Sequence, residues 1–224
     1  MRRLRNLVLG FLLVVLLTPT LLIAAYRFVN PPVTPLMLIR LAEGEGLKKA
    51  WRSLDQISPH LPKAVIAAED NRFCAHAGFD LDELADQIDR WLEGGRPRGA
   101  STITMQTAKN LFLWPERDPA RKIIEAWLTW QIELLWPKDR ILAVYLNVVE
   151  FGSGIYGAEA AARRFFDRPA QALTPMQSAR LAVVLPNPRD YSPVDPSAYL
   201  DARAREIARR VGQLGDLLDC VPGR

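Results

Sequence analysis

The sequence predicts a mostly α-helical protein, with a helical body behind one apolar N-terminal helix. Apolar residues recur at helical spacing through most of residues 58–218, and helix-start signals precede several of these stretches. The sequence contains no alternating strand pattern of convincing length and no internal repeat. Its 224 residues are enough for one substantial core domain with an appendage. We therefore expect the body to be all-α.

The N-terminal segment has the length and polarity of a membrane anchor. Residues 7–25 are 19 mostly apolar residues, and a helix of that length spans about 28 Å, close to the hydrocarbon core of a bilayer. Residues 1–6 carry three arginines, which predicts a cytoplasmic N-terminus, a single pass through the inner membrane and a body on its outer side. Pro19 should kink this helix without preventing a span. The alternative is a cleaved signal peptide, because "IAAY" offers small residues near the end of the segment.

Residues 26–57 are predicted to link this anchor to the body. The stretch "VNPPVTPL" has three prolines in eight residues, which favours a stiff and extended spacer. An amphipathic segment, residues 37–54, follows it. The body then comprises residues 58–224.

Capping residues mark the predicted helix starts in the body. Ser58 before Pro59 suits an N-cap followed by the first helical position. Asp80 with Glu83 three positions later resembles a capping box. Further starts are predicted at Asp118–Pro119 and at Thr174–Pro175 with Gln177, and a last amphipathic helix at 198–218.

Composition and missing motifs exclude several function classes. The net charge of +4 depends on the three arginines of the first five residues, so it does not indicate nucleic-acid binding. The sequence has no serine–lysine acyl-transfer signature, Walker loop, HExxH or CxxC pair, and we expect no organic cofactor. With only two histidines, a histidine-based metal site is improbable. Cys74 and Cys220 could pair in an oxidising compartment.

The first candidate acid lies in "AAEDNRFCAHAGFD", residues 67–80. If the helix continues past Ala68, then Glu69, Phe73 and His76 share one face. An acid among apolar residues has its charged form disfavoured, which suits proton transfer. The alternative is a Glu–Asp pair at a helix end that is solvated or caps the helix.

A basic block with hydroxyl and amide side chains follows at residues 96–122. It has six basic residues against two acidic ones, together with Ser101, Thr102 and Gln106. This composition suits a phosphorylated ligand, because cations neutralise phosphate while hydroxyls position it. The alternative is a loop and a solvated helix face. Glu125 is a second acid nearby, and taken alone it predicts a surface ion pair with Arg121.

These features together indicate sugar transfer from a lipid-linked pyrophosphate. That reaction needs a base for the acceptor hydroxyl and positive charge for the leaving pyrophosphate.

Five motifs then occur in the order that they have in a known family. They are "EDNRFCAHAGFD", "RGASTITMQTAKNLFL", "RKIIEAWL", "KDRILAVYLNVVEFGSGIYGAEAAARRFF" and "LAVVLPNP". Through them the chain resembles, over residues 58–193, the peptidoglycan glycosyltransferases of the penicillin-binding-protein type.

The resemblance implies a lysozyme-like helical domain that polymerises lipid II at the outer face of the cytoplasmic membrane. Glu69 would be the base that deprotonates the 4-hydroxyl of the acceptor N-acetylglucosamine. That oxygen would attack the anomeric carbon of the donor chain and expel undecaprenyl pyrophosphate with inversion. The implied partners are lipid II, the growing glycan chain, the membrane and other cell-wall synthesis proteins.

The resemblance also assigns roles to other residues. Glu125 matches the family's second acid, which either assists the leaving pyrophosphate or holds a divalent cation such as Mg²⁺ or Mn²⁺. The remaining positions surround the donor, line the cleft or shape the first motif. They are Lys109, Arg117, Arg121 and Lys122 around the donor, Ser101, Thr102 and Gln106 in the cleft, and Asp70, Phe73 and His76 in the first motif.

The chain departs from the family pattern in the second motif, where two glutamines are usual and this chain has Met105 before Gln106. Cys74 is also unusual in the first motif. Neither change removes an acid or a base, so we expect an active enzyme. Because the chain ends at Arg224, we expect no transpeptidase domain and hence a polymerase only.

Two other functions fit parts of the sequence. A lysozyme-like enzyme that cleaves glycan would need an acid, but it has no use for the basic block. A non-catalytic membrane-anchored scaffold for cell-wall synthesis would need neither acid.

Overall fold

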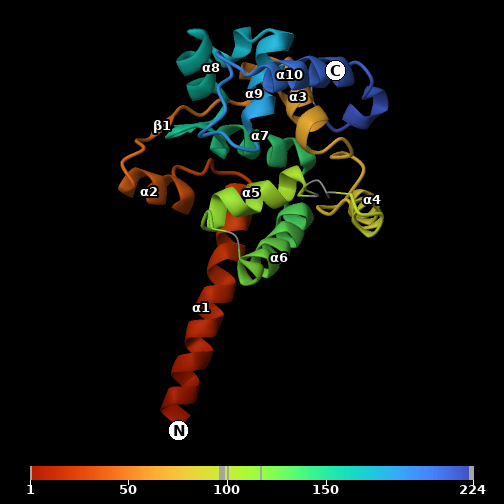
Figure 1. Ribbon diagram of the computed structural model, residues 1–224. Helices are drawn as coiled ribbons and strands as arrows, with labels where there is room; N and C mark the ends of the chain where they lie inside the picture. The colour runs from red at the N-terminus through yellow and green to blue at the C-terminus, as the bar shows by residue number, and fades with distance from the viewer. Residues whose placement is uncertain (1, 96–98, 100, 117, 222–224) are drawn as a thin grey trace.

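The computed structural model describes residues 2–95, 99, 101–116 and 118–221. Helix α1 (Arg2–Tyr26) projects from a compact helical body, and the C-terminus lies at the opposite end of that body (Figure 1). Pro19 lies inside α1, which continues past it. Within the part of the chain that the structure describes, no helix combines the length and apolarity that a membrane crossing requires.

The C-terminal end of α1 is bonded to the body. The indole Nε1 of Trp136 donates to the carbonyl of Ile23 at 2.7 Å, and Ile23 is fully buried. Arg140 donates to the carbonyl oxygens of Tyr26 at 2.6 Å and Val29 at 2.8 Å. Cationic side chains commonly bind the last carbonyls of a helix in this way. The junction between α1 and the body is therefore held by several directed bonds.

The structure is mostly helical, as predicted, but a short sheet joins the linker segment to the body, so the all-α prediction is wrong in that detail. Helix α2 (Pro35–Ala42) ends well before residue 54, so the amphipathic segment is only partly helical. Strand β1 (Lys48–Lys49) pairs in parallel with β3 (Ile155–Tyr156), which pairs antiparallel with β2 (Glu150–Gly152). Strands of two or three residues are too short to show an alternating pattern.

Three helices form one half of the body. Helix α3 (His60–Glu69) packs against α9 (Pro175–Val184) and α10 (Ala198–Val211). The predicted helix start at Thr174 is confirmed, and Thr174 and Gln177 form a capping box there. The predicted Ser58 N-cap is wrong, because Pro59 occupies the N-cap position of α3 and makes no side-chain cap there. The Ser58 hydroxyl instead donates to the carbonyl of Leu173 at 2.8 Å. The last helix is shorter than predicted, and the 3₁₀ turn η3 (Gly215–Leu218) follows it.

The other half is built on α5 (Ile103–Phe112), which packs against α6 (Pro119–Leu135) and α7 (Lys138–Val148). The start of α6 at Asp118 is confirmed, since its side chain accepts from the N–H of Arg121. Helix α8 (Ala158–Phe166) and the 3₁₀ turns η1 (Leu54–Gln56) and η2 (Ala170–Ala172) complete the body. The site described below lies where α3 meets α5.

Helix α4 (Leu81–Leu92) lies at the edge of the body (Figure 1). Its predicted start is confirmed, because Asp80 accepts from the N–H of Glu83 at 3.0 Å. Its apolar residues keep helical spacing but face outward, and Leu81 is 69% exposed. The apolar face of this helix therefore does not serve the core.

A disulfide joins Cys74 to Cys220, whose Cα atoms are 5.5 Å apart. The pairing that the sequence allowed is thus present. It links the segment between α3 and α4 to the chain beyond η3, across 146 positions of sequence.

Candidate active site

Two adjoining clefts open beside α5. The first has a volume of about 730 Å³ and is lined by Glu69, Ser101 and Arg203, among others. The second, of about 560 Å³, includes Lys109. Both are lined by Gln106 and by Pro186. The two clefts therefore meet next to the Gln106 amide.

Glu69 is the last residue of α3, which corrects one prediction. The chain leaves the helix at Asp70, whose φ of −162° is extended. Asp70 is held there by the N–H of Ile103, which donates to Oδ2 at 2.9 Å. The helix therefore does not continue, and Phe73 and His76 do not share a helical face with Glu69.

The Glu69 carboxylate is half-buried and has a neutral hydrogen-bond partner. The Gln106 amide Nε2 donates to its Oε2 at 2.8 Å. Burial raises the pKa of Glu69, while the Gln106 bond, Arg203 and Lys109 oppose that rise. A carboxylate whose pKa is raised is a better proton acceptor than an exposed one. Glu69 thus has the properties of a general base that opens onto a cleft.

The loop after Glu69 is held by a network around His76. Its Nδ1 accepts from the N–H of Gly78 at 3.2 Å, and its Nε2 lies 2.9 Å from Asp70 Oδ1. A backbone N–H can only donate, so Nε2 carries the proton and donates to Asp70. Thr102 continues the network, because its hydroxyl donates to the carbonyl of Gly78 at 2.7 Å. Asp70, His76 and Thr102 therefore fix the loop against the start of α5.

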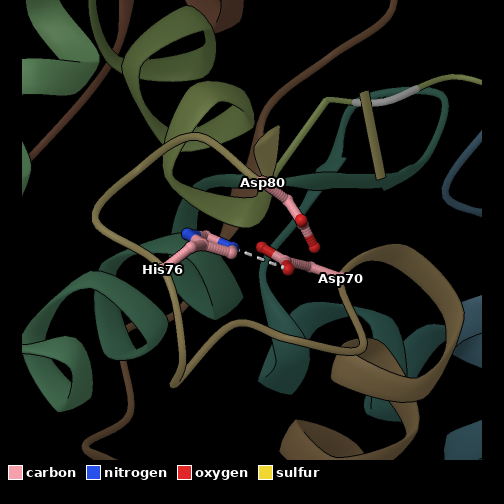
Figure 2. A group of neighbouring side chains, drawn as sticks. All are labelled: Asp70, His76 and Asp80. Atoms are coloured by element: carbon pink, nitrogen blue, oxygen red, sulfur yellow. Dashed lines mark hydrogen bonds and ion pairs between the residues drawn. The ribbon is translucent and has the colours of Figure 1, made fainter. Parts of the chain in front are cut away.

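Figure 2 shows Asp80 pointing toward Asp70 and His76, and the nearest oxygen and nitrogen atoms of the three lie within 4.8 Å of one another. This set resembles a cation site in composition. However, Nε2 of His76 carries the proton that it donates to Asp70, and Asp80 caps α4. These hydrogen bonds leave the imidazole without a lone pair for a metal ion at that position. We therefore assign these three residues to the structure of the loop.

Phe73 also supports the loop rather than the cleft. Its ring is fully buried, and Lys138 Nζ lies 4.6 Å from the ring centroid. The contact joins the loop to α7 through a cation–π interaction. The predicted shaping role of Phe73 is therefore one of packing.

Glu125 is buried, so the predicted surface ion pair is wrong in its location. Its side chain is 3% exposed, and that of Arg121 is 8% exposed. Arg121 Nη1 donates to Oε2 at 2.8 Å, and Lys122 Nζ donates to Oε1 at 2.6 Å. Lys122 also donates to the Ser101 hydroxyl at 3.0 Å. Glu125 is thus an acid with two cationic partners, one of which, Lys122, also binds Ser101 at the first cleft. Its role at the donor site stays a prediction.

Lys109 of α5 lies close enough to both acids for their charges to act on it. Burial is the main cause that lowers the pKa of Lys109, with Arg121 and Lys122 adding to it, while Glu125 and Glu69 oppose the change. A cation that lies among other cations is a favourable site for an anionic group. Arg117, which was predicted to surround the donor, lies outside the described residues.

Two residues at the site were not predicted. Tyr145 of α7 donates its hydroxyl to Gln106 Oε1 at 2.9 Å, and in the sequence it looked like one more member of an apolar stripe. Arg203 of α10 lines the first cleft, and its charge acts on Glu69. The signal for Arg203 is weak, because it lies in a helix rich in arginine.

The site therefore combines a general-base candidate at one cleft with a second acid that binds a buried arginine and a partly exposed lysine, on a mostly helical scaffold. These features define an enzyme suited to transfer from a donor with an anionic leaving group.

Comparison with known proteins identifies the family. The model of the family described as "Transglycosylase" matches residues 37–212. A biosynthetic peptidoglycan transglycosylase of Caulobacter vibrioides is 50% identical over 98% of this chain and 97% of its own length. The proteins of that name from Rhodospirillum centenum and Xanthomonas campestris are 55% and 52% identical, over 85% and 86% of this chain and 83% and 81% of their own lengths. The chain belongs to the transglycosylase family and is a peptidoglycan glycosyltransferase.

Proposed function

We propose that this enzyme polymerises lipid II into β-1,4-linked glycan strands, with Glu69 as the general base. The observation that carries the proposal is the half-buried Glu69 carboxylate, bonded to a neutral amide, at a cleft that adjoins a cluster of cations, of which Arg121 is buried. We include a lysozyme-like arrangement of the domain in this proposal. Lipid II and the growing glycan chain are the substrates.

The proposed reaction moves one proton and exchanges one bond at carbon. Glu69 takes the proton of the acceptor 4-hydroxyl, and that oxygen forms a bond to the anomeric carbon of the donor. The bond from this carbon to the pyrophosphate oxygen breaks, and undecaprenyl pyrophosphate leaves with the electron pair. Attack from the face opposite the leaving group inverts the anomeric carbon from α to β.

The cations and hydroxyls beside α5 and α6 suit the leaving group and the sugar. Lys109, Arg121 and Lys122 would offset the charge that develops on the pyrophosphate. Arg121 and Lys122 already bind Glu125, so an anion that enters would share them with this carboxylate. Ser101 and Thr102 line the first cleft and would position the sugar there. Arg117 is included here on the family resemblance alone.

A divalent cation at Glu125 fits these residues poorly. Each carboxylate oxygen of Glu125 already accepts from a cationic side chain. A metal ion would have to displace Lys122 or lie beside two positive charges. We therefore derive no catalytic step through Mg²⁺ or Mn²⁺.

We also propose that the protein is anchored in the cytoplasmic membrane by residues 7–25, with the N-terminus in the cytoplasm and the body outside. The apolar composition of this segment supports the assignment. Exposed apolar side chains on α4 and on the outer face of α6, such as Trp91 and Ile123, suit contact with lipid. Other cell-wall synthesis proteins remain proposed partners.

The first experiment is polymerisation of labelled lipid II by the purified full-length enzyme in detergent. We expect long glycan that lysozyme digests. The rate of Glu69→Gln should be about 10²- to 10⁴-fold lower, because removing a general base typically costs that much. Glu93, an exposed acid directly after α4 and outside both clefts, supplies the control, and Glu93→Gln should keep the full rate. A near-normal rate for Glu69→Gln would contradict the role of Glu69.

Two assays separate the alternatives. Release of muropeptides from purified sacculi would indicate a glycan-cleaving enzyme. A folded wild-type protein that makes no polymer, while its Glu69→Gln variant still binds cell-wall synthesis proteins, would indicate a scaffold.

A further inference from the structure

We propose that Tyr145 is a positioning residue for Glu69 and acts through the Gln106 amide. The inference rests on the proposed role of Glu69. Tyr145 contacts neither acid directly in the bonds that the structure gives it, so its effect must pass through Gln106.

The three side chains come from three helices and form one hydrogen-bonded chain. The Tyr145 hydroxyl on α7 donates to Gln106 Oε1 at 2.9 Å. The Gln106 Nε2 on α5 donates to Glu69 Oε2, at the end of α3, at 2.8 Å. Each bond has ordinary length and a matched donor and acceptor.

The hydroxyl decides which way the amide faces. A phenol O–H that points at the amide favours the oxygen end there, and this turns the NH₂ end toward Glu69. If the amide rotated by half a turn, its oxygen would face the carboxylate and the two acceptors would repel. Burial raises the pKa of Tyr145 well above its ordinary value, so the phenol keeps the proton that it donates.

The hydrogen bond from Gln106 affects Glu69 in two ways. Holding Oε2 fixes the rotation of the carboxylate and therefore the direction in which Oε1 points. The Nε2 donation also opposes the rise in the pKa of Glu69 that burial causes. The other charged or titratable groups that act on Glu69 are its neighbour Asp70, Lys109 of α5 and Arg203 of α10. Among these partners, Gln106 is the neutral one, and its orientation depends on Tyr145.

The chain offers a matched control for removing the hydroxyl. Tyr145 and Tyr156 are both fully buried. The Tyr156 hydroxyl has no hydrogen-bond partner among the described residues, whereas that of Tyr145 binds Gln106. The change from Tyr to Phe keeps the ring in both cases. The two variants therefore differ in whether a bonded hydroxyl is lost.

We expect the polymerisation rate of Tyr145→Phe to fall about tenfold, the usual effect of one lost hydrogen bond, and that of Tyr156→Phe to stay unchanged. The acidic limb of the pH–rate profile of Tyr145→Phe should move to higher pH, because Glu69 loses the donor that lowers its pKa. In a Gln106→Met background, Tyr145→Phe should have no further effect, since the intermediary is already absent. A purely structural role for Tyr145 predicts an unmoved limb and additive effects, and would overturn the inference.

A readout without substrate separates this inference from the proposed function. The Glu69 carboxyl can be titrated by ¹³C NMR, with Glu69→Gln identifying its signal. An unchanged Glu69 titration in Tyr145→Phe contradicts the positioning role, whatever the activity. A near-normal rate for Glu69→Gln contradicts the proposed function instead, even if the titration shifts.

Discussion

Glu69 and Glu125 are two acids of one site with different partners. Glu69 ends α3 and its carboxylate binds the neutral Gln106 amide, whereas Glu125 lies within α6 and binds Arg121 and Lys122. Glu69 opens onto the first cleft, but Glu125 is almost completely buried. A neutral donor leaves a carboxylate available to take a proton, while two cations cancel its charge. The comparison teaches that the partner of an acid, more than its burial, indicates its role.

Replacing glutamate by glutamine should change the free energy of unfolding in opposite directions at the two positions. Glu125→Gln leaves the buried Arg121 guanidinium without its carboxylate, which typically costs about 3–5 kcal/mol. Lys122 is 46% exposed, so water can solvate its ammonium group when the Glu125 carboxylate is lost. We expect a large fall in the free energy of unfolding, measured with denaturant, and a strong loss of polymerisation. The exposed Glu93→Gln is the control, and a Glu125→Gln protein as stable as the control would show that the Arg121–Glu125 pair contributes no net stability.

Lys109 is a further cation of the site, near the two cations that bind Glu125. Lys109→Ala should lower kcat/KM for lipid II by about 10- to 100-fold, because one charge-assisted contact to the leaving group is lost. The measurement is initial-rate kinetics over a range of lipid II concentrations. Lys63→Ala on α3, which lines neither cleft, should match the wild type. Unchanged kinetics for Lys109→Ala would remove Lys109 from the donor site.

The smallest expected effect is a higher free energy of unfolding in Glu69→Gln than in the wild type. Burial raises the pKa of Glu69 in the folded state, so folding loses stability as the pH rises from the ordinary glutamate value through the raised one. Glu69→Gln removes this cost. The variant should therefore be more stable than the wild type at about pH 8, and the gain should vanish at about pH 4.

Denaturant unfolding of both proteins at the two pH values measures this difference. An equal gain at both values would mean that packing, and not the charge of Glu69, is responsible. A loss of stability at about pH 8 would mean that the folded protein stabilises the charged Glu69 carboxylate, as the two cations stabilise that of Glu125.

Local signals predicted much of the fold. Asp118 and Thr174 are side-chain caps whose partners lie three residues away, so the sequence alone indicates their helices. The end of α3 could not be predicted in this way. It depends on Asp70 accepting from Ile103, which lies 33 positions along the chain, and no local pattern records such a bond.

The candidate site was predicted from composition and from the family resemblance, not from geometry. Glu69, Lys109 and Glu125 were named as candidates, yet the burial of Glu125 was not predicted, because i,i+4 spacing is the same for exposed and buried pairs. Tyr145 was missed for a related reason. A tyrosine within an apolar stripe gives no indication of whether its hydroxyl has a partner.

The disulfide between Cys74 and Cys220 has a consequence for the order in which the enzyme is assembled. Cys74 lies in the loop that follows Glu69, and Cys220 lies near the end of the chain. Synthesis proceeds from the N-terminus, so the loop is made long before its covalent partner is available. Since disulfides form in oxidising compartments, this tether can close only once Cys220 has reached such a compartment. Under the proposed topology, with the body outside the cytoplasm, export would therefore act as a maturation step for the enzyme.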